Sequence, residues 1–187
     1  MNSKTKKQNS KSKIAAALIP EIAAKTQNKV TQTYAQKLLV ELCQINTTPS
    51  ADVSIMRDAE NRCLEVLERE LKKLSFANGR LERRSINPNI KSHPNYSLPH
   101  FTKTKQRPAG LSAEETYAGR SNLVYVAPGT NAKDRGISVA LNAHIDVVAP
   151  YFPPRLKNGI VFGRGACDDK GPVVAMLIAL KILSEIG

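Results

Sequence analysis

Residues 137–143 read Ile-Ser-Val-Ala-Leu-Asn-Ala and run into His144-Ile-Asp146, while residues 163–172 read Gly-Arg-Gly-Ala-Cys-Asp-Asp-Lys-Gly-Pro. The first stretch is a dense apolar run that is typical of a buried β-strand, and it ends on two polar side chains. The second stretch is a glycine-rich turn directly before an apolar segment, with proline well placed for the first turn of a helix. A strand followed by a turn and a helix predicts an α/β fold.

The sequence upstream predicts two amphipathic helices and further strands. Apolar residues recur every three or four positions from Val30 onward, and again over roughly 54–75, which is typical of helices that cover a sheet. Short apolar runs predict strands over 81–86 and 122–126, and a short strand or turn edge at 160–162. The expected fold class is therefore α/β, with helices packed on a mixed, mostly parallel sheet.

Two segments fall outside this pattern. Residues 1–28 form a basic tail, with a short Ala-rich helix predicted around 14–24. Residues 87–121 contain four prolines and no clear periodicity, which predicts a long surface excursion. A Ser-x-x-Glu capping box predicts one short helix within it, at 112–117. A loop this long in a compact domain is either functional or an insertion.

The net charge of +12 is concentrated in two places. Residues 1–29 contribute +6 and residues 71–107 contribute +8, so the remaining sequence is slightly acidic. The second segment also holds aromatic residues, a combination that base-stacking surfaces use. A solvated basic face explains the same pattern, and we do not expect nucleic-acid binding. A steep fall of any nucleic-acid affinity with salt would distinguish the two interpretations.

Composition excludes several classes of protein. Hydrophobic residues make up 41% and charged residues 24%, which rules out wholesale disorder. No apolar run approaches the roughly 20 residues that a membrane span needs, so no membrane partner is expected. Cysteines at 43, 63 and 167 follow no metal-ligand spacing and predict buried free thiols in a reducing compartment. Pro20 interrupts the only short N-terminal apolar stretch, so we expect a cytoplasmic protein without a signal peptide.

Each of the two quoted stretches has a structural and a chemical interpretation. His144 and Asp146 share one face of the predicted strand, where the carboxylate could orient a metal-binding imidazole. A histidine satisfied by a neighbouring carboxylate explains the pair equally well. Asp168 and Asp169 precede a helix, where simple capping would stabilise them. Their spacing from the glycines fits neither a phosphate-binding P-loop nor the dinucleotide-binding fingerprint.

Together, the strand ending in His-x-Asp and the later Gly-Arg-Gly-x-x-Asp-x-Lys-Gly turn before a helix resemble one family. The pattern is similar to that of the zinc-dependent peptidases and amidohydrolases that include acetylornithine deacetylase, succinyl-diaminopimelate desuccinylase, aminoacylase, carboxypeptidase G and carnosinase-type dipeptidases. The resemblance covers residues 122–187. It implies that residues 29–187 are the N-terminal part of a two-zinc exopeptidase catalytic domain, which hydrolyses the amide bond of a dipeptide or an N-acyl amino acid.

The resemblance also implies residue roles. His144 matches a zinc ligand, and Asp168 matches the carboxylate that bridges two zinc ions, for which Co²⁺ or Mn²⁺ can substitute. Asp146 matches the catalytic-site acid that supports the histidine. Roles in shaping the loop fall to Arg164, Asp169, Lys170 and Gly171. Such a metal pair polarises an amide carbonyl and activates a shared water.

The chain also departs from the family. Its Asp-Asp-Lys-Gly-Pro sequence resembles the dipeptidase branch slightly more than the deacetylase branch. Members of the family usually carry a tryptophan after the position that Asp146 matches, and this chain has none. The Glu-Glu pair of the family, which includes the general base, has no match before Gly187. We therefore expect an N-terminal fragment that is inactive alone, with homodimers possible only for the full-length enzyme. The alternative is a non-catalytic, basic nucleic-acid-binding or remnant protein.

Overall fold

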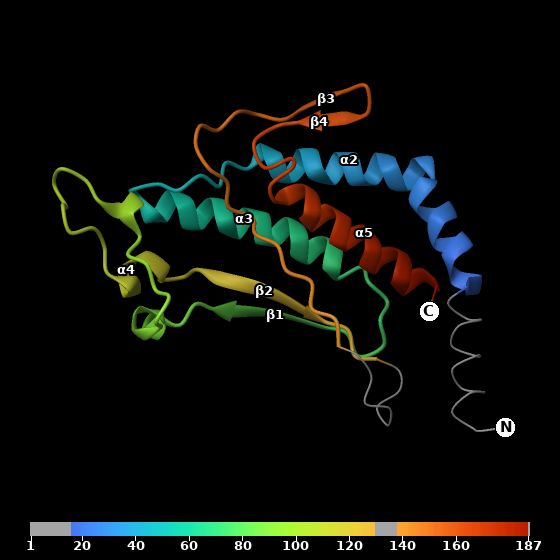
Figure 1. Ribbon diagram of the computed structural model, residues 1–187, viewed down its shortest axis with the longest axis horizontal. Helices are drawn as coiled ribbons and strands as arrows, with labels where there is room; N and C mark the ends of the chain where they lie inside the picture. The colour runs from blue at the N-terminus through green and yellow to red at the C-terminus, as the bar shows by residue number, and fades with distance from the viewer. Residues whose placement is uncertain (1–15, 130–137, 187) are drawn as a thin grey trace.

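The computed structural model describes residues 16–129 and 138–186 (Figure 1). Three long helices lie side by side over a small antiparallel sheet. The helices are α2 (Lys29–Gln44), α3 (Val53–Leu71) and α5 (Lys170–Ile186). The sheet pairs β1 (Arg80–Ser85) with β2 (Ser121–Val126).

Both predicted amphipathic helices are confirmed, and each begins at a side-chain cap. Asn28 accepts a hydrogen bond from the Val30 N–H, and Asp52 accepts one from the Ser54 N–H. Helix α3 ends at Leu71 rather than near residue 75, because its last turn tightens. The N–H groups of the two residues after Lys72 bond to carbonyls three positions back, in the 3₁₀ manner.

The core lies between the three helices and one face of the sheet. Leu38 and Leu42 of α2 meet Leu64 and Leu67 of α3 there. Residues of β1 and β2 and the apolar face of α5 close the cluster, with contributions from Leu81, Leu123, Tyr125, Val173, Val174, Leu177, Ile178 and Ile182. Cys43 and Cys63 are buried free thiols as predicted, whereas the prediction is wrong for Cys167, which is exposed in the turn before α5.

The excursion over 87–121 is fastened to the helices. It contains two 3₁₀ turns, η1 (Pro88–Ser92) and η2 (His100–Thr102), and helix α4 (Ala113–Tyr117). The predicted capping box is confirmed, since the Ser112 side chain and the Glu115 side chain bond reciprocally to each other's backbone N–H. Arg107 donates to the carbonyls of Ala51 and Thr102 at 2.8–3.0 Å, which ties the excursion to the start of α3.

The predicted strand over 137–143 and the mostly parallel sheet are not found in the described residues. Residue 137 lies outside them, and 138–148 runs as an extended segment that joins no strand ladder, drawn as an orange coil in Figure 1. Both described ladders are antiparallel: β1 with β2, and β3 (Arg155–Lys157) with β4 (Ile160–Phe162). A strand needs a neighbouring backbone to pair with, and here Val139 and Leu141 are 79% and 56% exposed instead.

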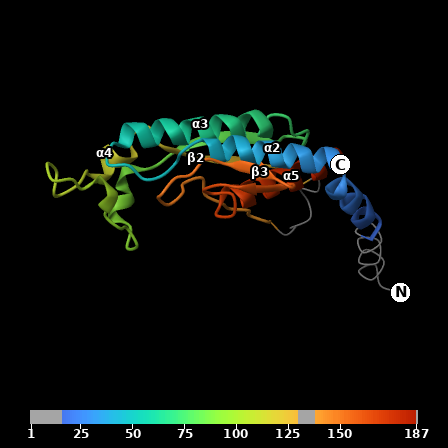
Figure 2. The same cartoon turned by 90° about the horizontal axis from the view of Figure 1, so that it is seen from above.

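A further helix over 16–27 precedes α2 at an angle, as Figure 2 shows from above. Part of the helix predicted around 14–24 lies outside the described residues. Lys25, near the end of this helix, forms an ion pair with Glu185 of α5 at 3.0 Å. Within the described part of the chain, no helix is both long and apolar enough to cross a membrane.

Candidate metal centre

The two stretches that the sequence singles out meet where the extended segment 138–148 passes the start of α5. His144 Nε2 lies 3.1 Å from Asp168 Oδ1. The backbone N–H of His144 also donates to Asp169 Oδ2 at 3.2 Å. The structure therefore brings together two side chains from separate parts of the sequence, which are the two expected metal ligands.

Asp146 orients the imidazole of His144 from its other side. His144 Nδ1 lies 3.0 Å from the backbone carbonyl oxygen of Asp146 and 3.3 Å from its Oδ1. With Nδ1 held in this way, Nε2 faces Asp168. Histidines that bind metals are usually oriented like this, with one ring nitrogen bonded to a carbonyl or carboxylate and the other free for the metal. Asp146 thus contributes through its backbone as well as through its carboxylate.

The charges around His144 favour a cation. Partial burial acts to lower the pKa of His144, but the hydrogen bond to Asp146 and the carboxylates of Asp146, Asp169 and Asp168 outweigh it, so the pKa lies above its usual value. The side chains of His144 and Asp168 are 51% and 85% exposed. The imidazole of His144 is therefore accessible to solvent, and the carboxylates around it favour a positive charge at this position.

The turn that carries Asp168 is braced against the preceding loop. Arg164 Nε donates to the Pro150 carbonyl at 2.9 Å, and its guanidinium lies 4.9 Å from the centre of the Phe152 ring. Gly165 has φ +87°, and an added Cβ would come 2.7 Å from a methyl carbon of Val147. Glycine is therefore required at this position by both backbone angle and space. The Asp168–Asp169 peptide bond is cis.

Lys170 faces the helices rather than the candidate site. Its side chain is 0% exposed, and Nζ donates to the carbonyls of Leu42 at 3.0 Å and Ile45 at 2.8 Å. Burial lowers the pKa of Lys170. Lys170 thus lies beneath the turn and contacts the end of α2.

Sequence reasoning missed two residues near the site, Thr47 and Tyr151. Thr47 Oγ1 donates to the Ile145 carbonyl at 2.6 Å, next to His144. The Tyr151 hydroxyl lies 3.1 Å from two carbonyl oxygens at the end of α2. Their only signals in the sequence are a helix-breaking Thr-Thr-Pro-Ser run and an aromatic residue among prolines, and neither indicates such contacts.

The donor types at this site fit zinc. An imidazole nitrogen and a carboxylate oxygen are both common zinc ligands. His144 and Asp168 supply one of each. Within residues 16–129 and 138–186, no group of three His, Cys, Asp or Glu side chains is gathered closely enough to hold a metal ion. The described residues therefore supply part of the three or four protein ligands that a zinc site takes.

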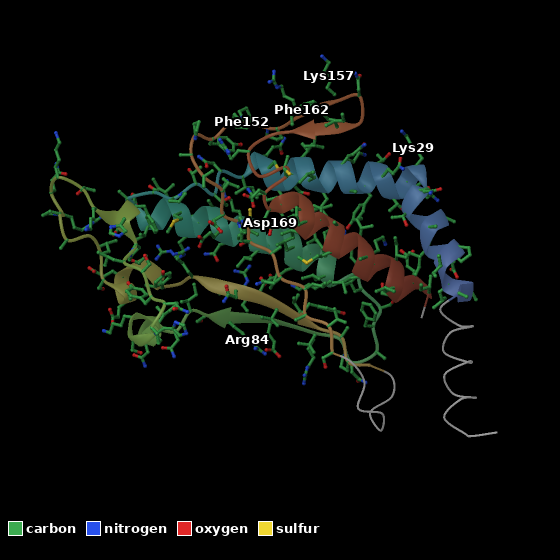
Figure 3. The ribbon with its side chains drawn as sticks, in the orientation of Figure 1. Lys29, Arg84, Phe152, Lys157, Phe162 and Asp169 are labelled. Carbon is green, nitrogen blue, oxygen red and sulfur yellow. The ribbon has the colours of Figure 1, made fainter. Side chains whose placement is uncertain are left out.

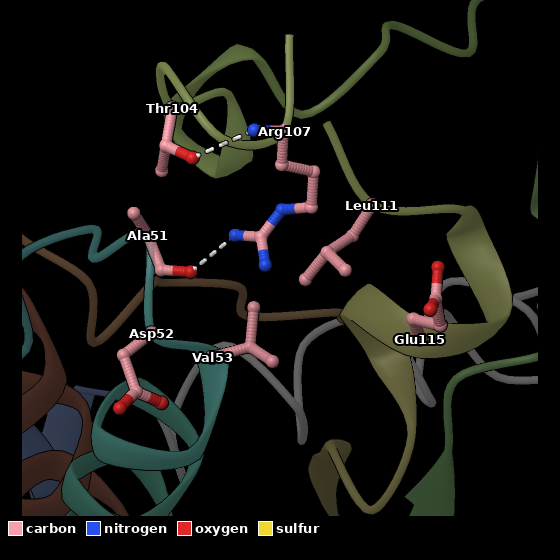
Figure 4. A pocket seen from close by; sticks show the side chains of 7 residues that line it. All are labelled: Ala51, Asp52, Val53, Thr104, Arg107, Leu111 and Glu115. Atoms are coloured by element: carbon pink, nitrogen blue, oxygen red, sulfur yellow. Dashed lines mark hydrogen bonds between the residues drawn. The ribbon is translucent and has the colours of Figure 1, made fainter. Parts of the chain in front are cut away.

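Two cavities lie apart from this site. One, of about 500 Å³, lies between the start of α3 and the excursion, with Arg107 pointing into it between Val53 and Leu111 (Figure 4). The other, of about 620 Å³, lies at the β3–β4 hairpin, where Figure 3 labels Lys157 and Phe162. Neither lining includes His144 or Asp168.

The segment that carries the candidate site is similar in sequence to known proteins. Residues 140–187 match the model of Peptidase family M20/M25/M40. The chain is similar to the [LysW]-lysine/[LysW]-ornithine hydrolase of Saccharolobus solfataricus, with 43% identity over 92 residues, and to that of Saccharolobus islandicus, with 33% over 92 residues. Each match covers 48% of this chain and 27% of the relative.

The same enzyme of Sulfurisphaera tokodaii is 45% identical over 49 residues, which is 26% of this chain and 14% of the relative. The matched part of the chain thus spans about a quarter of the length of the curated relatives in the two longer alignments. No solved structure matches the chain. The expected resemblance to metal-dependent peptidases and amidohydrolases is confirmed over residues 140–187, which are similar to the model of this peptidase family.

Proposed function

We propose that this protein is a zinc-dependent hydrolase that cleaves the amide bond of a dipeptide or an N-acyl amino acid. The observation that carries the proposal is the 3.1 Å approach of His144 Nε2 to Asp168 Oδ1, within the segment that matches the peptidase family. Two donors that zinc accepts converge there, and Asp146 orients one of them. We expect Co²⁺ or Mn²⁺ to substitute for zinc.

The residues take the following roles in this proposal. His144 and Asp168 would hold the metal pair. When bound, such a pair supplies Lewis acidity to the amide carbonyl and lowers the pKa of a water. Asp146 keeps Nδ1 of the imidazole engaged, and Asp169 fixes the backbone of His144. Arg164 braces the turn.

The relatives suggest which substrates to test. Their names describe hydrolases that act on lysine or ornithine joined to LysW. By that similarity, we propose substrates in which the amide bond releases a basic amino acid, and we include both dipeptides and N-acyl derivatives.

Among the described residues, no observation favours the nucleic-acid alternative. Several cations of the basic stretch 71–107 are engaged in ion pairs within the chain. Lys73 pairs with Glu70, Arg83 with Glu68, Arg84 with Glu82 and Lys91 with Glu114. Paired cations have less charge available for phosphates, so the hydrolase proposal accounts better for the molecule.

The test is zinc binding by the metal-free chain, measured by isothermal titration calorimetry. Hydrolysis of lysine and ornithine dipeptides and N-acyl derivatives is then measured with an enzyme that also carries the Glu-Glu pair, because this chain is expected to be inactive alone. His144→Ala and Asp168→Asn each remove a proposed ligand, and we expect zinc affinity to fall by roughly 100-fold or more. His100→Ala and Asp58→Asn are matched controls at exposed positions outside the site and should bind as the wild type does. Wild-type zinc affinity in both site variants would refute the proposed site.

A further inference from the structure

Lys170 is a buried cation whose hydrogen bonds go to a helix end. An ammonium group has three donors, and two of them reach the carbonyls of Leu42 and Ile45 at the C-terminus of α2. Leu42 lies in the last turn of α2 and Ile45 is its C-cap, where the helix dipole favours a cation. In the described part of the chain, no carboxylate forms an ion pair with Lys170. The contact therefore attaches the turn that carries Asp168 to the end of α2.

Thr47 attaches the other half of the site to the same segment. It is 1% exposed, its Oγ1 donates to the Ile145 carbonyl at 2.6 Å, and its own carbonyl accepts the Val147 N–H at 3.2 Å. The two bonds lie on either side of Asp146 in the sequence. Together they fix the backbone that carries His144 and Asp146 against Thr47.

Tyr151 makes a third attachment. Its hydroxyl lies 3.1 Å from the carbonyl oxygens of both Cys43 and Gln44, so one proton is shared between two acceptors at the end of α2. The loop on which Tyr151 stands also supplies the carbonyl that accepts from Arg164. Every stretch that shapes the candidate site is thus fastened to residues 42–47.

We propose that residues 42–47 are the platform that positions the candidate metal centre, with Lys170 and Thr47 as positioning residues. Lys170 fixes the turn of Asp168, and Thr47 fixes the segment of His144. Because both are held to one short segment, the two ligands meet although they come from separate parts of the sequence. This inference rests on the proposed function for its consequence, which is metal affinity, but the positioning can be measured without metal.

The experiment titrates the full chain with Co²⁺ alone and follows the visible absorption bands of the bound ion. Thr47→Val removes the hydroxyl at constant shape, Thr47→Ser keeps the hydroxyl, and Lys170→Met removes the ammonium at similar length. Lys181→Met, on the exposed side of the same helix, is the control. We expect Thr47→Val and Lys170→Met to weaken Co²⁺ binding by at least about tenfold and to alter the absorption spectrum. Thr47→Ser and Lys181→Met should stay within about twofold of the wild type, with its spectrum.

Hydrogen exchange of the metal-free protein gives the second measurement. We expect Thr47→Val to speed exchange of the Val147 amide by about tenfold or more, with no change for Lys181→Met. Should Lys170→Met fail to fold, the comparison of Thr47→Val with Thr47→Ser decides. Wild-type affinity, spectrum and Val147 exchange in Thr47→Val would overturn the positioning role. Failure of the wild type itself to bind Co²⁺ would refute the proposed function, and the exchange of Val147 would then decide the positioning role alone.

Discussion

The helical layer of α2, α3 and α5 and the site-bearing stretches over 138–148 and 163–169 are built in different ways. The helices are held by apolar side chains, and Leu42 and Cys63 are completely buried between them. The site-bearing stretches expose their polar side chains and are held by hydrogen bonds to backbone carbonyls. Leu42 belongs to both parts, because its side chain is in the core and its carbonyl accepts from Lys170.

This difference implies that the helical layer determines the stability of the fold and that the site-bearing stretches determine metal binding. Apolar burial supplies most of the free energy of folding, so changes in the helical layer should alter unfolding. Exposed polar residues contribute little to folding, so changes at the candidate metal centre should alter binding alone. The following variants test that separation.

Leu42→Ala should have the largest effect on stability. Removing a fully buried leucine leaves a cavity in the core, and we expect the free energy of unfolding to fall by about 2–5 kcal/mol. Urea denaturation followed by circular dichroism measures the loss. Leu156→Ala, at an exposed position of β3, is the control and should cost less than about 0.5 kcal/mol. Similar losses in the two variants would contradict the comparison.

Glu70 should make the helical layer sensitive to acid. Burial acts to raise its pKa, but hydrogen bonds from Lys73, Tyr34 and Arg69 outweigh this and lower the pKa to about 2. The unfolded chain binds this proton more readily than the folded one. The stabilisation is therefore present above about pH 4.5 and is lost as the pH falls toward 2, by roughly 3 kcal/mol in total.

Urea denaturation of the wild type and Glu70→Gln at several pH values between 6 and 2 measures this contribution. The wild type should lose stability more steeply with falling pH than the variant does. Glu65→Gln, an exposed position on the same helix, should retain the slope of the wild type. Parallel pH curves for the wild type and Glu70→Gln would show that this carboxylate does not carry the effect.

His144→Ala should have the smallest effect on folding. Its side chain is half exposed, so we expect the unfolding free energy without metal to stay within about 0.5 kcal/mol of the wild type. Added zinc should raise the Tm of the wild type and leave that of the variant unchanged, because only a folded state that binds the ion is stabilised by it. A loss of more than about 1 kcal/mol without metal would show that the site also supports the fold.

The elements that the sequence predicts well are those that a local pattern determines. The spacing of apolar residues locates α2 and α3, and the Ser112 capping box locates α4. The strand over 137–143 has an equally clear apolar pattern, but strand pairing depends on a neighbour that the segment does not itself encode. Strand β3 is not predicted from the sequence either, because its exposed Arg-Leu-Lys has no apolar pattern that indicates a buried strand.

The candidate site divides in the same way. The sequence predicts His144 and Asp168 as candidate ligands because the two segments that carry them together resemble a family pattern. The contacts of Thr47, Tyr151 and Lys170 are with backbone carbonyls, which every residue carries, so no residue type at the other end marks them. Their partners are known only once the end of α2 is placed beside the start of α5.

Because the site is attached to residues 42–47, insertions and deletions should be tolerated in some parts of this chain and not in others. One residue added or removed between Ile45 and Thr47 would shift the carbonyls that Lys170 uses relative to the hydroxyl that holds Ile145. Both proposed ligands would then be misaligned by a change far from either in sequence. In homologous proteins, insertions and deletions should therefore be excluded from this linker and tolerated in the excursion over 87–121, so that the length of the linker is inherited as strictly as the ligands.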